Sequence, residues 1–213
     1  MASGEAQSFR ISLIRCLDAR LNGREGAMRS DPETMNEQFR ADWSRFHPNQ
    51  EPIGWLLRAR PIPWVRFHAL PESKRYAEDA AERATILARA YILAAEVLGE
   101  GASCWMIASY YWFGEKAAEG EPTLEWVYDD DDEDLGIFRS EVSLTEWRSG
   151  AHDTSLRAIA EGQTAHEVWM ARATGEIFAP YDGGFDLFLS DWTRVAVLKT
   201  KWASWLSSYP GGL

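Results

Sequence analysis

Cysteine is scarce in this chain of 213 residues, which contains only Cys16 and Cys104. The first lies near the N-terminus and the second in a predicted buried strand, so their spacing fits neither a disulfide framework nor a cysteine metal site. Two classes of protein are therefore excluded: small domains held together by disulfides, and zinc-knuckle proteins. We expect reduced thiols in a cytoplasmic protein.

Long hydrophobic runs are also missing. Residues 1–15 lack the apolar core of an export signal. The most apolar later stretch, residues 84–98, is interrupted by Arg89 and is too short to span a bilayer. We therefore expect a cytoplasmic protein without a membrane span.

Positive charge is in deficit, because 22 Lys and Arg face 33 Asp and Glu and the net charge is −11. Residues 1–75 carry 12 basic and 9 acidic side chains, whereas residues 76–213 carry 10 and 24. Such a field repels nucleic acid and attracts a basic protein. We expect a basic protein partner and no nucleic-acid partner.

Familiar catalytic motifs are lacking too. His47, His68, His152 and His166 are scattered, and none forms a His-Glu-x-x-His pair of metal ligands. Phosphate-binding loops, dinucleotide fingerprints and Gly-x-Ser-x-Gly elbows are missing as well. Catalytic groups can converge from distant positions, so an enzyme is less expected but not excluded. No cofactor is expected.

Apolar residues, by contrast, are abundant, since 46% of the chain is hydrophobic and 11 residues are Trp. This supply is sufficient for a core, and the length favours one domain. We assign residues 31–213 to that domain and residues 1–30 to an N-terminal extension with one predicted helix. The domain is predicted to be α+β, with a mixed or antiparallel sheet and helices packed mainly on one face.

Hydrophobic periodicity and capping residues locate the elements of the domain. Helical spacing predicts helices at residues 31–46, 77–98, 153–161 and from 190 to about 206. Alternation, or a short apolar run between turn residues, predicts strands at residues 64–70, 103–112, 124–128, 137–142, 167–171, 176–179 and 185–189. Asp31 and Ser190 are residue types that favour N-caps and are predicted to begin the first and last helices.

Eight of the 11 tryptophans are assigned to two groups. Five fall on predicted apolar faces and are assigned to the core: Trp64, Trp105, Trp169, Trp192 and Trp202. Three flank an acidic segment and are predicted to be less buried: Trp112, Trp126 and Trp147.

Two blocks of sequence carry a resemblance. The first is Trp-Val-Arg-Phe-His-Ala-Leu-Pro-Glu-Ser-Lys-Arg-Tyr-Ala-Glu at residues 64–78. The second is Tyr-Asp-Gly-Gly-Phe-Asp at residues 181–186, followed by Trp-Leu-Ser at 205–207 and a final Pro-Gly-Gly-Leu. Over roughly residues 50–213 the chain resembles small bacterial proteins classed only as a domain of unknown function. The resemblance implies a shared fold and a bacterial cytoplasmic setting, and it supplies no catalytic residue.

Six consecutive acids occupy residues 129–134, between two predicted strands. They do not fit a calcium loop, which needs ligands at alternating positions around a central glycine. Such a run is usually a solvated loop, but beside exposed tryptophans it is also typical of an interface. Our leading hypothesis is a non-catalytic protein-binding domain of the immunity type, which neutralises a basic toxin. The expected partner-binding residues are Trp112, Trp126, Tyr128, Asp129, Asp130, Asp131, Asp132, Glu133 and Asp134.

A second hypothesis starts from the cations in the first block. Arg66, His68, Lys74 and Arg75 could bind a small anion, or they could simply pair with neighbouring acids. If the two blocks meet in the fold, Asp182 and Asp186 would complete an enzyme or anion-binding site.

The aspartates of the second block also allow a metal-binding interpretation. Asp182 and Asp186 lie around Gly183-Gly184, an arrangement that is equally typical of a tight turn. No metal site is predicted, therefore, and Asp182 with Asp186 is only an alternative. The oligomeric state is left open.

Overall fold

The computed structural model describes residues 32–115, 123–129, 135–164 and 166–206. The predicted helix within residues 1–30 and the predicted Asp31 cap lie outside the described residues. Contacts divide the chain into Met1–Asp31 and Pro32–Leu213, and the fold below is that of the second unit. Within the described ranges, no helix is both long and apolar enough to cross a membrane.

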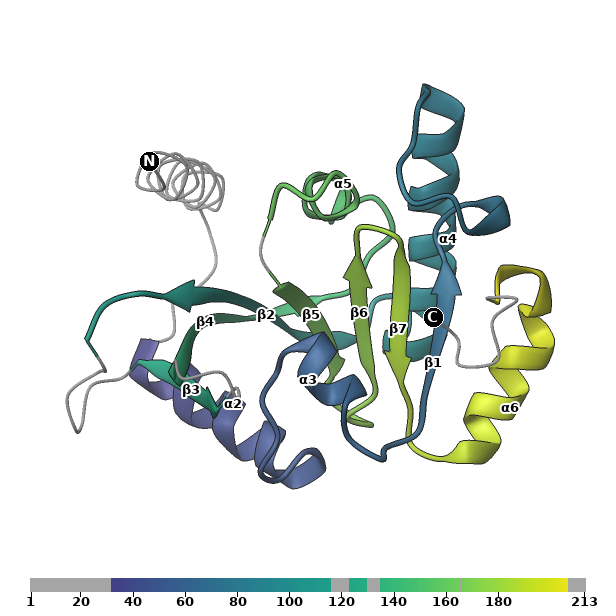
Figure 1. Cartoon of the computed structure of the whole chain (residues 1–213). Coiled ribbons are helices and arrows are strands. Elements are labelled where there is room, and N and C mark those ends of the chain that lie inside the picture. The colour runs from purple at the N-terminus through teal and green to yellow at the C-terminus, as the bar shows by residue number, and fades with distance from the viewer. Residues whose placement is uncertain (1–31, 116–122, 130–134, 165, 207–213) are drawn as a thin grey trace, which may run out of the picture. The chain divides into compact units, whose positions relative to one another are not determined.

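One antiparallel sheet of seven strands organises the described chain (Figure 1), in the spatial order β1-β7-β6-β5-β2-β4-β3. The strands are β1 (Trp64–His68), β2 (Ser103–Trp112), β3 (Leu124–Asp129), β4 (Leu135–Glu146), β5 (His166–Ala171), β6 (Ile177–Tyr181) and β7 (Gly184–Phe188). Every predicted strand is present, although β4 is longer at both ends than predicted. The α+β prediction with an antiparallel sheet is confirmed.

Helices pack on both faces of this sheet. They are α2 (Pro32–Phe46), α3 (Gly54–Arg58), α4 (Ala80–Leu98), α5 (Asp153–Ala160) and α6 (Trp192–Lys201), with 3₁₀ turns at η1 (Pro71–Ser73) and η2 (Ala203–Trp205). The short helix α3 and the 3₁₀ turn η1 were not predicted, because the prolines around them suggested only an irregular connection. The predicted last helix ends earlier than expected, at Lys201, and η2 follows it.

The core has two parts because alternate strand residues point to opposite faces. On β5, Trp169 belongs to the cluster under α4, α5 and α6, whereas Val168 and Met170 belong to the cluster under α2 and α3. Three helices, including the longest, thus cover one face, and two cover part of the other. This double coverage explains why β5, β6 and β7 are almost continuously buried.

The starts of two helices differ from prediction. Helix α4 begins at Ala80 because the Asp79 side chain accepts a hydrogen bond from the N–H of Glu82. Helix α6 is capped by Asp191, which accepts from the N–H of Arg194, so the prediction of Ser190 as the cap is wrong. The hydroxyl of Ser190 donates to Asp191 instead.

Two tryptophan predictions are also wrong. Trp147 is fully buried, because it turns under α5, where its ring stacks on His152 and meets Trp169 edge-on. Trp192 is 60% exposed, because the buried side chains of α6 are Val195 and Leu198 and its first turn is left open.

The two edge strands of the sheet differ in what pairs with them. At one edge, Phe67 of β1 forms an antiparallel bridge with Leu206, so the chain's own last described residue covers part of that strand. At the other edge, β3 pairs with β4 on one side, and no further strand of the described residues pairs with it. Figure 1 shows this β2-β4-β3 end far from α4 and α6, with α2 alongside it.

Candidate functional site

The acidic run joins β3 to β4 at the open end of the sheet. Asp129 is the last residue of β3 and lies opposite Leu135 in the register. Asp130, Asp131, Asp132, Glu133 and Asp134 lie outside the described residues, and Tyr128 and Asp129 are described only through their backbone. The structure therefore describes the ends of β3 and β4, between which the predicted acidic surface lies in the sequence.

Trp112 forms one face of this open end with a partly buried ion pair. The Arg139 guanidinium lies 3.8 Å from the centroid of the Trp112 ring and donates to Glu125 at 2.7 Å. The Trp112 indole N–H donates to the carbonyl of Glu115 at 2.8 Å. This charged pair is satisfied internally, so it shapes the surface and offers no unpaired cation.

Trp126 lies on the opposite face of the same hairpin. It stands across from Phe138 in the register, and its indole N–H donates to the Ser140 hydroxyl at 3.0 Å. Trp112 stands across from Ile137, whose neighbour Phe138 points the other way. The two predicted tryptophans therefore do not form one patch.

A separate pair of aromatic side chains is exposed at the end of β2. Phe113 is 92% exposed and Tyr111 is 45% exposed, and their rings stack at 6.3 Å. Tyr111 in turn packs on the buried Phe138 ring at 4.1 Å. We name Tyr111 and Phe113 the hairpin-end surface. The edge residue Val127, which is 37% exposed, stands across from Ile137 and therefore points to the other face of the sheet.

The sequence-based prediction missed this surface, because the only aromatic residues it included were Trp112, Trp126 and Tyr128. The run Tyr-Tyr-Trp-Phe-Gly at residues 110–114 was an available signal. In such a run at the end of a strand, not every ring can point into a core, since neighbours alternate between faces.

The two resembling blocks do meet, because β1 pairs with β7. Arg66 stands directly opposite Asp186 and donates to it through Nε at 2.8 Å and through a terminal nitrogen at 3.0 Å. Arg58 of α3 donates to the same carboxylate at 2.8 Å. The Asp186 side chain is 3% exposed, and the Tyr181 ring lies 4.5 Å from the Arg66 guanidinium. This is a buried ion cluster between two strands and a helix.

The remaining residues of the second hypothesis have other partners. Lys74 donates to Glu82 at 2.7 Å, and Arg75 pairs with Asp182 at 2.7 Å. His68 is hydrogen bonded to Ser73, and its pKa is lowered by burial and by nearby guanidinium groups.

The cations of the second hypothesis therefore pair with separate acids. Asp182 and Asp186 are held by different arginines rather than converging on one point. Among the described residues, no group of three or more His, Cys, Asp or Glu side chains could hold a metal ion. The pairing observed is the one expected of cations in an acidic chain.

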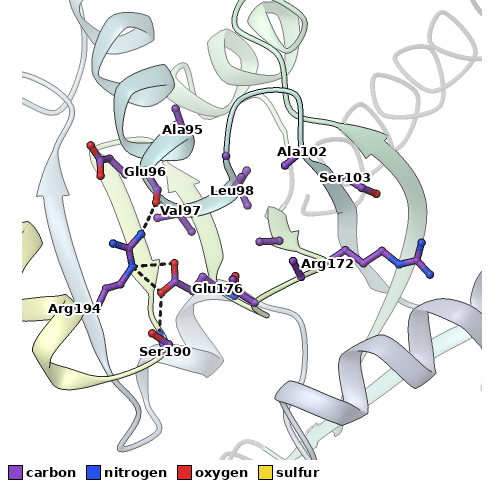
Figure 2. Close-up of a pocket in the computed structure, with 14 residues that line it drawn as sticks. Ala95, Glu96, Val97, Leu98, Ala102, Ser103, Arg172, Glu176, Ser190 and Arg194 are labelled. Carbon is purple, nitrogen blue, oxygen red and sulfur yellow. Dashed lines mark hydrogen bonds and ion pairs between the residues drawn. The ribbon is translucent and has the colours of Figure 1, made fainter.

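A pocket of 690 Å³ lies elsewhere, between the end of α4, the turn from β5 to β6 and the start of α6 (Figure 2). Small apolar side chains such as Leu98, Ala102 and Ala173 form much of its lining. Glu176 and Arg194 supply charge in its wall. The volume is in the range of small-molecule sites.

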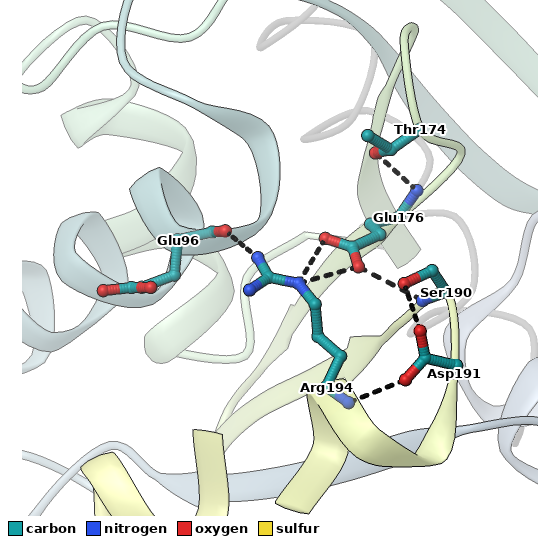
Figure 3. A network of polar contacts seen from close by, with 6 residues as sticks. All are labelled: Glu96, Thr174, Glu176, Ser190, Asp191 and Arg194. Atoms are coloured by element: carbon teal, nitrogen blue, oxygen red, sulfur yellow. Dashed lines mark hydrogen bonds and ion pairs between the residues drawn. The ribbon is translucent and has the colours of Figure 1, made fainter. Parts of the chain in front are cut away.

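Glu176 is fixed by a network that joins three elements (Figure 3). Its carboxylate accepts from Arg194 Nε at 2.9 Å and from the N–H of Ser190 at 3.1 Å. A terminal nitrogen of Arg194 also donates to the backbone carbonyl of Glu96 in α4. No sequence pattern indicated this network, because its members are separated by up to 98 positions.

The cysteine available for chemistry among the described residues is Cys104. It is fully buried on β2, and burial raises its pKa to about 12. A thiol with that pKa remains protonated at neutral pH and is a poor nucleophile or metal ligand. The expectation of a reduced thiol is consistent with this environment.

Comparison with known proteins identifies a family. A family model described as a domain of unknown function (DUF3885) matches residues 53–210, which is well over half of the chain. No curated protein and no solved structure matches this chain.

Proposed function

We propose that this chain, which belongs to the DUF3885 family of domains of unknown function, is a non-catalytic binding protein that recognises a basic protein through its open sheet end. The observation that carries the proposal is the hairpin-end surface, where Phe113 is 92% exposed at the end of β2. In the same part of the sheet, beyond β4, the edge strand β3 leads into six consecutive acids. The specific form proposed is an immunity-type protein acting in a bacterial cytoplasm against a basic toxin.

Exposed aromatic side chains support a protein partner. Aromatic residues bury a large area with few rotatable bonds, and they dominate the binding energy of many interfaces. Tyr111 rests on the fully buried Phe138, so the exposed rings have a rigid support. A pre-positioned anchor binds without a large ordering cost.

The edge strand supports the mode of binding. An unpaired strand edge can accept a strand from another protein through backbone hydrogen bonds. At the opposite edge, Leu206 already bridges to Phe67 of β1. This asymmetry favours β3 as the edge that a partner would extend.

Charge supports a basic partner over a second copy of this chain. In a two-fold dimer formed through β3, the two edge strands would pair antiparallel, so the acidic runs would lie at opposite ends of the pair. The two copies would still repel one another as like-charged molecules, whereas a cationic partner is attracted. The net charge of −11 adds to the preference.

The enzyme or anion-binding alternative receives less support. It needs Arg66, His68, Lys74 and Arg75 to act on one ligand, and three of these are engaged by three different acids. What remains in its favour is that Asp186 neutralises only one of the two guanidinium groups it receives.

The test is capture of a partner from bacterial lysate at low and high salt, followed by binding measurements with the purified partner. We expect a basic protein whose binding is lost when Asp129, Asp130, Asp131 and Asp132 are all changed to Lys. Arg75→Ala, an exposed member of the cationic block, should bind normally. Loss of binding in Arg75→Ala with retention in the acidic variant would refute the proposal.

The aromatic contribution is tested separately with one matched pair. Phe113→Ala should weaken binding of the purified partner by at least about tenfold, as expected for an anchor. Trp192→Ala removes another exposed aromatic side chain, on α6, and should leave binding unchanged. Equal effects of the two substitutions would show that the hairpin-end surface is not the interface.

A further inference from the structure

The pocket at the end of α4 is formed by rigid parts of the fold. Its walls come from the last turn of α4, the turn between β5 and β6, and the start of α6 (Figure 2). The Glu176 network connects all three, and the Glu176 side chain is only 5% exposed. A site whose polar group is already held in place can bind a ligand without rearrangement.

The hydrogen-bond donors around this pocket are largely engaged. Arg194 uses Nε for Glu176 and a terminal nitrogen for the carbonyl of Glu96. Arg172 is held by Asp42 at 2.7 Å, and Figure 2 shows its guanidinium pointing away from Glu176. An anionic ligand would therefore have to displace existing ion pairs.

The last two backbone acceptors of α4 are more available, because the hydrogen-bond ladder of the helix stops at the pocket. The N–H of Gly101 donates to the carbonyl of Trp147 at 2.7 Å. The N–H of Ala102 donates to the carbonyl of Gly99 at 3.2 Å. Neither N–H therefore donates to one of the last two carbonyls of α4, as it would if the helix continued. Helix C-termini also carry partial negative charge, and α4 has 19 residues aligned toward this end.

The geometry points to a binding site for a small organic cation, in which an ammonium or guanidinium group meets the last carbonyls of α4 and shares Glu176 with Arg194, while an alkyl chain lies on the apolar wall. Each Glu176 oxygen retains acceptor capacity beyond the contacts it makes within the network. Charge-assisted hydrogen bonds are the strong ones, so the cationic group would dominate recognition. Leu98 and Ala173 provide the surface for the alkyl chain.

The first experiment compares four probes of similar size by NMR titration of the full chain. The probes are n-butylammonium, n-butylguanidinium, n-butanol and butyrate. We expect saturable shifts of pocket amides with the two cations, at least about tenfold tighter than with butyrate or butanol. Binding of butyrate as tight as that of the cations would overturn the cation assignment, as would the absence of binding by all four.

Variants then locate the binding. Ala173→Trp fills the pocket from an exposed turn position and should abolish cation binding, whereas Ala81→Trp, at the exposed start of α4, should not. Glu176→Gln removes the charge but keeps the shape, and should weaken binding by about tenfold. Cation binding that survives Ala173→Trp would refute the site, whether or not Glu176→Gln folds.

Discussion

Asp186 holds two guanidinium groups at a position that solvent hardly reaches. Its side chain is 3% exposed, and its partner Arg66 is 8% exposed. Removing one partner of a buried pair leaves an uncompensated charge in a poorly solvated place. Asp186→Asn should therefore lower the free energy of unfolding by about 3–5 kcal/mol, measured by chemical denaturation.

A matched control for that substitution is Asp182→Asn. Asp182 also pairs with an arginine, but Arg75 is 63% exposed. Exposed pairs contribute about 0–1 kcal/mol, so this change should be nearly silent. Equal losses of stability in the two variants would contradict the distinction between buried and exposed pairs.

Gly175 occupies the turn between β5 and β6 with a φ of +75°. A Cβ there would overlap the side chain of Phe46 at the end of α2. Gly162 has a φ of +67°, but a Cβ there would meet nothing within 4 Å. Gly162→Ala should cost about 1 kcal/mol from backbone strain alone, and Gly175→Ala distinctly more. Thermal unfolding of both variants checks this, and an equal cost would show that Phe46 yields freely.

His166 should make stability depend on pH. Burial lowers its pKa below 6.5, so the unfolded chain takes up the proton more readily than the folded protein. The neutral His166 ring therefore makes its full contribution to stability above about pH 6.5. That contribution is lost as the pH falls toward the folded-state pKa. His47, whose pKa burial also lowers, acts in the same direction.

His166→Phe is the variant that tests this dependence. The His166 ring meets Phe138 and Tyr111 edge-on, and a phenyl ring can preserve these contacts. Denaturation between about pH 7 and 5 should show a shallower decline of stability in the variant than in the parent protein. An unchanged slope would mean that His166 does not titrate differently in the two states.

At the scale of helices and strands, the local sequence pattern was sufficient to predict an element whose own residues carry the pattern. Alternation predicted β1, and the Gly99 stop predicted the end of α4. The pairing of Arg66 with Asp186 was beyond reach, because it depends on a strand register that joins positions 120 residues apart. The burial of Trp147 was misjudged for the same reason, since its acidic neighbours in sequence are not its neighbours in space.

The open edge of β3 leads to a prediction about that element. Val127 is 37% exposed on an edge strand, so a lysine there should not disturb the core. Natural proteins use lysine in this way to prevent a strand edge from pairing with another chain. Val127→Lys should therefore weaken partner binding by at least about tenfold while unfolding at the same temperature as the parent. Full-strength binding would exclude β3 as the docking edge.

Across the whole molecule, two properties of the proposed interface should act on different steps of binding. Long-range attraction between an acidic protein and a basic partner accelerates encounter, and salt screens it. Short-range packing of Phe113 forms only after encounter, so it controls dissociation. The net charge of −11 and the hairpin-end surface are therefore separable by kinetics.

This separation can be measured with three variants and the purified partner. Asp130→Lys and Glu161→Lys change the net charge equally, so a larger loss of association rate in Asp130→Lys reports the location of the charge. We expect that loss to shrink as salt is raised, because the Debye length falls from about 10 Å at 0.1 M to about 3 Å at 1 M. Phe113→Ala should speed dissociation and leave association nearly unchanged. If Asp130→Lys and Glu161→Lys slow association equally, only the overall charge steers the partner and the acidic run has no special role.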